Sequence, residues 1–156
     1  MILSNLSIST NDLIYHGGIL ISKYWDETPI YKHIPYSLAS TTEFLHSFLS
    51  DEDGYLYVHM RDDRAIAMLA AITTPTFFNS SYTVLENILT YVDEEHRGSI
   101  IGPRMIKEMI KWGEWKGAKH AHISTISGIG SERTTKLYEK LGFTIVGSTA
   151  SMPIGE

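Results

Sequence analysis

Residues 54–74, GYLYVHMRDDRAIAMLAAITT, constrain the fold of this chain more than any other segment. Two runs rich in apolar, aromatic and β-branched residues flank the dipeptide Asp62-Asp63, a pattern that predicts two antiparallel strands joined by a tight turn. The run YTVLENILTYV, from about Tyr82 to Val92, predicts a third long strand. Such a sheet has apolar faces that helices must cover.

Helical patterns lie on both sides of these strands, with apolar residues spaced for one buried face and with capping residues at their starts. Helices are predicted from residue 10 or 11 to about 25, from 40 or 41 onward, from 103 to about 116 and from 131 to 140. Shorter strands are predicted at residues 1–8, 121–127 and 143–148, the last pairing with a tail at 150–154. The order predicts an α/β (α+β) fold, a single domain over residues 1–156 with a central mixed, mostly antiparallel twisted sheet flanked by helices.

Composition narrows the class of protein. A chain of 156 residues can form one domain with an apolar core but is short for two. The net charge of −5 argues against nucleic acid as a partner. No apolar run approaches the length of a bilayer span and no secretory signal pattern is visible, so we predict a cytoplasmic protein without a membrane partner. The chain has no cysteine, which excludes disulfides, thiolate metal sites and an acyl-cysteine intermediate.

The stretch HRGSIIGPR at residues 96–104 connects the third long strand to the following helix. A helix N-terminus presents unpaired N–H groups and the positive end of the helix dipole, and glycines let the backbone approach an anion closely. Such a loop can bind a diphosphate, and Arg97 and Arg104 add positive charge. The alternative is an ordinary turn, in which Gly98 and Gly102 only permit the bend and the arginines are solvated.

Three segments in one order carry a resemblance to a known family: the strand ending YVDEEHRG, the helix PRMIKEMIKWGEWKGA and the sequence LYEKLGF at residues 137–143. Together they resemble the GNAT superfamily of acyl-CoA-dependent N-acetyltransferases, with small bacterial or phage-encoded members the most similar. The similarity extends from about Ser81 to Gly147 and, in strand order, back to Gly54. It implies acetyl-CoA as co-substrate and transfer of an acetyl group to a primary amine of a small molecule or protein. Because no cysteine is available to carry the acetyl group, direct transfer in a ternary complex is the expected route.

The resemblance also implies where acetyl-CoA binds. The end of the strand, Tyr91, Val92 and Asp93, would pair with the pantetheine amides. The loop that would hold the pyrophosphate consists of Arg97, Gly98, Ser99, Ile100, Ile101 and Gly102, followed by Pro103 and Arg104. Two positions depart from the family pattern. Ile100 replaces a glycine, and a β-branched residue disfavours positive φ and adds bulk near the phosphates. Ser131 replaces an asparagine that contacts the pantetheine arm.

Glu86 is a candidate general base. By the strand period of two, Val84, Glu86, Ile88, Thr90 and Val92 should share one face, on which Glu86 is the only carboxylate. A partly desolvated glutamate has a raised pKa suited to accepting a proton, and in the family a glutamate on this strand often plays that role. The alternative is an edge position where Glu86 only meets water.

Tyr138 is a candidate general acid. Its residue type and place on an amphipathic helix also fit a core-packing role. The resemblance matches it to a tyrosine whose phenol lies near the CoA sulfur, where it would protonate the departing thiolate.

The acceptor amine is not identified by the sequence. Residues 24–36 and 74–82 are rich in aromatics and would wall the acceptor pocket, and Asp26 and Glu27 could attract a cation. The alternation of His120 and His122 is weak evidence for a metal, and we predict no metal site. Dimers are common in the family, so a homodimer is one assembly to consider, although the sequence does not determine it.

Two other functions remain open at this level. Because Ile100 and Ser131 depart from the family pattern, the chain could be a catalytically inactive module that binds CoA or a protein partner. A nucleotide-binding P-loop is disfavoured, because Pro103-Arg104 stand where its lysine and Ser/Thr would follow Gly102.

Overall fold

The computed structural model of the chain describes residues 1–152 and 154. Its elements, in chain order, are β1 (Ile2–Ser4), α1 (Thr10–Glu27), η1 (Pro29–Tyr31), α2 (Leu38–Ser50), β2 (Gly54–Arg61), β3 (Arg64–Thr76), β4 (Asn79–Val92), η2 (Glu94–His96), α3 (Ile101–Trp115), β5 (His120–His122) and α4 (Ser131–Lys140). No helix in this part of the chain is long and apolar enough to cross a membrane.

The five strands form one mixed sheet in the order β1-β2-β3-β4-β5. The long strands β2, β3 and β4 are antiparallel to one another, whereas the short edge strands β1 and β5 run parallel to β2 and β4, respectively. Asp62 and Asp63 both have positive φ, 49° and 59°, which is the conformation that a two-residue turn between twisted strands requires. The predicted hairpin and the predicted fold class are confirmed.

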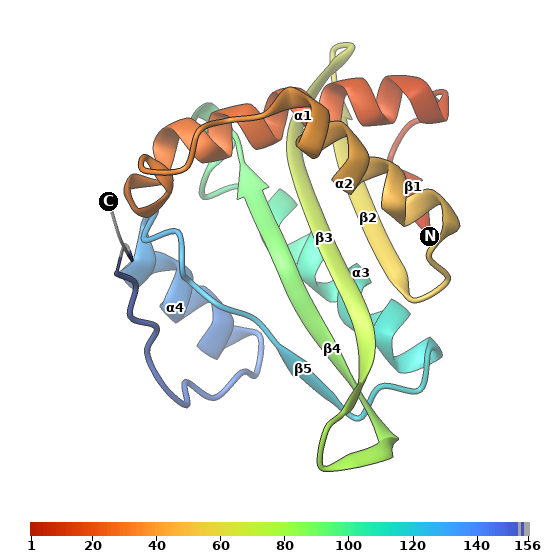
Figure 1. Cartoon of the computed structure of the whole chain (residues 1–156), viewed down its shortest axis with the longest axis vertical. Coiled ribbons are helices and arrows are strands. Elements are labelled where there is room, and N and C mark those ends of the chain that lie inside the picture. Colours follow the sequence, from red (N-terminus) through yellow and green to blue (C-terminus); the bar gives the residue numbers. More distant parts are fainter. Residues whose placement is uncertain (153, 155–156) are drawn as a thin grey trace.

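Helices cover both faces of the sheet (Figure 1). One core lies between the sheet and helices α1 and α2, and includes Leu20 and Leu45. The other lies between the sheet and helices α3 and α4, and includes Met109 and Tyr138. Gly17 inside α1 has a packing role, because a Cβ on it would lie only 3.3 Å from the Leu45 side chain of α2. The two helices therefore approach closely at this point.

Several of the sequence-based boundaries were wrong. The first helix is capped by Ser9, whose hydroxyl accepts a hydrogen bond from the Asp12 N–H at 3.1 Å, rather than by residue 10 or 11. The strand predicted at 121–127 is restricted to β5, and residues 143–148 form no strand. Residues 150–152 and 154 of the predicted tail strand are not in a strand either, and residue 153 lies outside the described residues.

The missing last strand has a structural cause. Pairing between β4 and β5 ends at Glu86 and His122, so β5 offers too short an edge for residues 143–148 to extend the sheet. At the start of that segment, the Phe143 N–H donates to the Tyr138 carbonyl at 3.0 Å and turns the chain back onto α4. High β-propensity alone cannot make a strand where no partner edge is available.

Candidate active site

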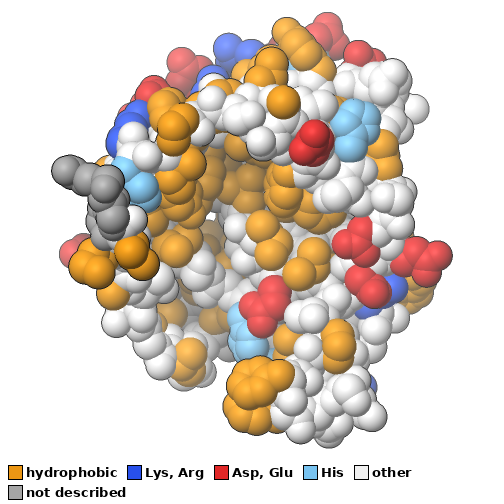
Figure 2. Space-filling model, viewed as in Figure 1, with side chains coloured by type: hydrophobic (Ala, Val, Ile, Leu, Met, Phe, Trp, Pro, Cys, Tyr) orange, Lys and Arg blue, Asp and Glu red, His pale blue; other side chains and the backbone are white. Residues whose placement is uncertain are grey.

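The sheet opens beyond the last pair of β4 and β5, Glu86 and His122. From there residues 87–92 and residues 124–130 diverge, and they line opposite walls of a cavity of about 520 Å³. Helix α4 and the loop before α3 complete its walls. Figure 2 shows the surface hollowed beneath α1, with apolar side chains gathered around the hollow. A cavity of this size and position can hold part of a small-molecule ligand.

A β-bulge in β4 lies next to this opening. Asn87 pairs with Ala71 and Leu89 with Ala70, which leaves Ile88 as the extra residue. The Asn87 side-chain amide donates to the carbonyl oxygens of Ala70 and Leu89, each at 3.2 Å, and so satisfies backbone groups around the irregularity. Asn87 itself lines the cavity, and the sequence analysis did not single it out.

The bulge changes which side chains share a face of β4. Leu85 packs in the core beneath α3, whereas Leu89 and Tyr91 pack in the core beneath α1. Simple alternation would have put all three on one face. The prediction that Val84, Glu86, Ile88, Thr90 and Val92 share one face is therefore wrong, because the extra residue inverts the alternation after position 88.

The loop before α3 accommodates Ile100 without strain. Gly98 has the positive φ of 81°, whereas Ile100 has φ −70° and ψ −11°, which suit any L-residue. The Ile100 side chain is 78% exposed and lies outside the cavity lining. In this geometry the β-branched side chain of Ile100 would not clash with phosphates bound in the cavity.

The predicted loop residues divide into two groups. Arg97, Gly98, Ser99, Gly102 and Pro103 line the cavity. The other predicted positions, Ile100, Ile101 and Arg104, do not line it within the described residues. Ile101 belongs to the core beneath α3, because the first turn of this helix directs its apolar stripe toward the sheet.

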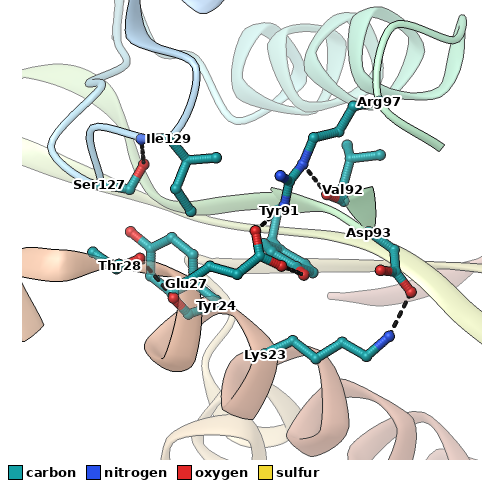
Figure 3. Close-up of polar contacts among 10 residues, drawn as sticks. All are labelled: Lys23, Tyr24, Glu27, Thr28, Tyr91, Val92, Asp93, Arg97, Ser127 and Ile129. Carbon is teal, nitrogen blue, oxygen red and sulfur yellow. Dashed lines mark hydrogen bonds and ion pairs between the residues drawn. The ribbon is translucent and has the colours of Figure 1, made fainter. Parts of the chain in front are cut away.

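Arg97 is already engaged by the protein (Figure 3). Its Nε donates to the Val92 carbonyl oxygen at 2.9 Å, and its Nη2 forms an ion pair with the Glu27 carboxylate at the end of α1. Glu27 also accepts a hydrogen bond from the Tyr91 hydroxyl, and burial together with this carboxylate raises the pKa of Tyr91. Glu27 is therefore part of this ion-pair network, whereas the sequence analysis expected it to attract a cationic acceptor.

Asp93 is also held within the protein. It is 8% exposed, and its carboxylate accepts from the Lys23 ammonium of α1 at 2.6 Å (Figure 3). Its backbone N–H donates to the Ile66 carbonyl oxygen at 2.8 Å, so it is not free to pair with a ligand. Of the three residues expected to pair with pantetheine, Tyr91 and Val92 line the cavity and Asp93 does not.

Helix α4 contributes Tyr138 to the cavity. Its side chain is 4% exposed, and its hydroxyl donates to the Ser124 carbonyl oxygen across a long 3.4 Å. Burial raises the pKa of Tyr138 to about 12, so the phenol keeps its proton at neutral pH. Ser131 does not line the cavity, but Thr134 and Arg133 from the same helix do.

Arg133 reaches from α4 to the loop before α3. A Cβ built on Gly98 would lie 1.9 Å from the Arg133 Nη2, so the guanidinium lies directly against this glycine. Because Gly98 carries no side chain, a cation from a separate helix can approach the loop backbone. Sequence reasoning missed Arg133, since the contact joins residues 35 positions apart and follows only from the fold.

Glu86 forms a pair with His122 at the closed end of the split. The Glu86 Oε1 and the His122 Nδ1 lie 2.7 Å apart, and the side chains are 37% and 54% exposed. The pair is adjacent to the cavity, because Asn87 of β4 and Ser124, two residues after His122, line it. Glu86 is thus a half-buried carboxylate, and its histidine partner was not foreseen by the sequence analysis. Within the described residues no group of His, Asp and Glu is arranged to hold a metal ion.

The chain is similar to known proteins in both sequence and fold. The model of the acetyltransferase (GNAT) family matches residues 20–143. No curated relative matches the chain. Similar solved structures include a Clostridium acetobutylicum predicted acetyltransferase with acetyl-CoA, at 15% identity and TM-score 0.68, with 94% of this chain and 92% of that chain covered.

Two further structures extend the comparison. The aminoglycoside 6′-N-acetyltransferase of Acinetobacter haemolyticus has 19% identity and a TM-score of 0.68, with 96% of each chain covered. The glucosamine-6-phosphate N-acetyltransferase of Arabidopsis thaliana has 12% identity and a TM-score of 0.72, with 96% of this chain and 97% of that chain covered. At these identities the likeness concerns the fold.

The Lys23–Asp93 ion pair predicts a pH-dependent stability. Burial alone would raise the pKa of Asp93, but the hydrogen bond and charge of Lys23 outweigh it and hold the pKa below its ordinary value. Ionised Asp93 therefore stabilises the fold above about pH 4, and this contribution is lost as the pH falls through the lowered pKa. We expect Lys23→Gln to reduce the free energy of unfolding by roughly 1 kcal/mol at pH 7, because Lys23 is partly exposed.

Urea unfolding of both proteins between pH 7 and pH 3 measures this difference, which should shrink toward zero at the acidic end. Lys32→Gln is the matched control. Its partner Asp26 also lies 2.6 Å away, but both side chains are exposed, so the loss should be near zero. A loss from Lys23→Gln that is the same at pH 3 and pH 7 would contradict the assignment.

Proposed function

The chain belongs to the GNAT acetyltransferase family, and from this premise we propose that it transfers an acetyl group from acetyl-CoA to a primary amine of a small molecule or protein within a ternary complex. The observation that carries the proposal is the cavity in the split sheet, which joins the glycine loop at the start of α3 to the buried Tyr138 hydroxyl. One solved structure of this fold is described with acetyl-CoA.

In this proposal the acetyl-CoA donor occupies the cavity with its diphosphate at the start of α3. Backbone N–H groups at the start of α3 and the positive end of its dipole favour a diphosphate, and Arg133 adds a cation against Gly98. The pantetheine arm would then lie along residues 87–92, which pair with β3 on one side but face no partner strand on the other side beyond Glu86. The thioester would reach the level of Tyr138. In this proposal Arg97 supports the loop rather than contacting phosphate directly.

The acceptor amine needs a base, and the Glu86–His122 pair is suitably placed at the end of the split. If Glu86 accepts the Nδ1–H of His122, the other ring nitrogen is free to take a proton from the ammonium. The resulting amine attacks the thioester carbon, and the C–N bond forms as the C–S bond breaks. A proton then passes from Tyr138 to the leaving thiolate, and the tyrosine is reprotonated from the amide nitrogen or water.

Release of free CoA thiol tests the proposed reaction directly. Because the chain has no cysteine, a thiol reagent detects only the product CoA and gives no background from the protein. A panel of amines, including a polyamine, an aminoglycoside, an amino-acid amide and a peptide N-terminus, should show thiol release that depends on both amine and enzyme. Tight acetyl-CoA binding without thiol release for any amine would favour a non-catalytic CoA-binding module.

Tyr138→Phe isolates the role of the phenol. We expect turnover to fall roughly 10²-fold, because the thiolate then departs without a proton donor, while the dissociation constant of acetyl-CoA changes little. Tyr55→Phe is the control, since Tyr55 is also buried in the core beneath α3 but does not line the cavity. Unchanged turnover in Tyr138→Phe would remove this residue as the acid.

Glu86→Gln and His122→Gln test the proposed base. Each should lower turnover with the amine found in the panel by roughly 10²-fold at neutral pH, with little change in acetyl-CoA binding. His120→Gln is the matched control, because His120 lies on the same strand and bonds to Tyr82 instead. Equal losses in all three variants would indicate a structural effect of the strand rather than proton transfer.

Gly98→Ala tests the contact between the loop and Arg133. The new methyl group would displace the guanidinium and crowd the diphosphate, so the affinity for acetyl-CoA should fall at least about tenfold. Gly117→Ala pays the same backbone cost, because its φ is +84°, but a Cβ there meets nothing within 4 Å. The control should lose stability and keep its affinity, as measured by calorimetry. An equal loss of affinity in both variants would exclude a local role for Gly98.

A further inference from the structure

The turn between β3 and β4 carries a pair of exposed aromatic side chains. Phe77 and Phe78 are 90% and 83% exposed, and their ring centroids lie 3.8 Å apart, so they form one apolar projection, here called the aromatic tip. Figure 2 shows apolar side chains clustered over this turn. The sequence has no Asp, Glu, Lys, Arg or His between residues 65 and 85, so the tip is uncharged. Exposed apolar surface gathered in one place marks a contact site more often than scattered apolar residues do.

An uncharged groove of about 540 Å³ lies between α1 and α2. Among the described residues its lining includes no Asp, Glu, Lys or Arg, and Tyr15, Ile19 and Leu38 contribute exposed apolar surface to it. Gly18 also lines the groove and is buried, but a Cβ there would meet nothing within 4 Å. Packing within the chain therefore does not require a glycine at this position, and glycine weakens a helix interior relative to alanine. The effect of the missing side chain is to keep the groove open.

The aromatic tip and the groove lie at opposite ends of the molecule. Figure 1 shows the β3–β4 turn at one end of the long axis, and α1 and α2 at the other. The two surfaces therefore cannot meet within one chain. A second copy related by a two-fold axis would bring each tip to the groove of the other copy, so that two identical contacts form and the assembly closes.

The exposed area favours two contacts over one. At about 200 Å² for each phenylalanine side chain, the tip exposes roughly 350 Å². A single contact that buries this area and an equal area of the groove would remove roughly 700 Å² from solvent, which is less than a stable interface needs. The two contacts of a closed pair would bury roughly 1,400 Å², which lies within the range of about 1,200–2,000 Å² for specific complexes.

We propose that two copies of this chain form a two-fold dimer, in which Phe77 and Phe78 of each copy occupy the groove between α1 and α2 of the other. The lack of charge on both surfaces favours their pairing over contact with a charged partner. It also favours a second copy over a membrane, because the chain carries a net charge of −5 and the tip has no lysine or arginine to attract anionic lipid. The inference does not depend on the proposed function, since neither the tip nor the described residues of the groove line the cavity.

Sedimentation velocity of the native chain from about 1 µM to about 200 µM tests the dimer, for which we expect a micromolar dissociation constant. Phe77→Ser/Phe78→Ser should raise this constant roughly thirtyfold or more, because both contacts lose their aromatic anchors. Gly18→Leu should do the same by filling the groove. It should also raise the melting temperature of the monomer, because leucine is a better helix former than glycine, so a loss of dimer cannot be ascribed to misfolding. Trp115→Ser is the matched control, since it removes an exposed aromatic side chain at the end of α3 and should leave the constant unchanged.

Cysteine cross-linking tests which surfaces meet, because the native chain has no cysteine. Ser80→Cys places a thiol beside the aromatic tip, and Leu38→Cys places one at the groove. With a mild oxidant, a mixture of the two variants should form disulfide-linked dimers at least about tenfold faster than either variant alone, since only the mixture brings the two thiols together across one contact. Faster cross-linking of Ser80→Cys with itself would mean that tip meets tip, and would contradict the proposal.

The remaining outcomes of the sedimentation experiment also decide the question. A native chain that stays monomeric at every concentration overturns the proposal. If that monomer binds phosphatidylcholine vesicles and Phe77→Ser/Phe78→Ser does not, the tip is a membrane contact instead. A dimer that Gly18→Leu leaves intact, or that Trp115→Ser weakens as much as the phenylalanine changes do, is not held by the tip in the groove and equally overturns the proposal.

Discussion

The end of pairing between β4 and β5 is the constraint on which the rest of the site depends. Up to Glu86 and His122 the two strands share a ladder, and beyond them the β4 backbone faces a cavity instead of a neighbour. The bulge at Ile88 comes directly after this point and redirects the side chains of the strand, while the amide of Asn87 bonds the carbonyls around it. A continuous ladder would leave no room for a ligand between the strands.

The walls of the opening are tied together by charge. Glu27 at the end of α1 accepts from both Tyr91 of β4 and Arg97 of the loop before α3, and Lys23 of α1 holds Asp93 just after β4 (Figure 3). One helix therefore supports both the strand that lines the cavity and the loop that would hold phosphate. These contacts give Arg97 and Asp93 supporting roles, whereas Arg133, which also lines the cavity, lies against the loop from α4.

The sequence pattern predicted the parts of the fold that depend on interactions between residues close together in the chain. Periodicity, capping residues and turn residues predict the turn at Asp62-Asp63, the long strands and the four helices. The glycine at position 98 was also correctly predicted to lie in the loop before α3, where it has a positive φ and lines the cavity. The predictions that were wrong or missing concern contacts between residues far apart in the sequence. The bulge inverted the alternation from which the exposure of Glu86 was judged, His122 meets it only through the strand register, and Arg133 reaches Gly98 only through the packing of α4. The last strand failed for want of a partner edge.

We propose that the cavity in the split sheet binds acetyl-CoA, and calorimetric titration of the native protein with acetyl-CoA measures this binding most directly. ATP serves as a control that also offers phosphates but has no pantetheine arm to lie along β4. The structure predicts saturable binding of acetyl-CoA with a micromolar dissociation constant (on the order of −8 kcal/mol) and no comparable binding of ATP. No detectable heat from acetyl-CoA, or equal affinity for ATP, would contradict the assignment of the cavity.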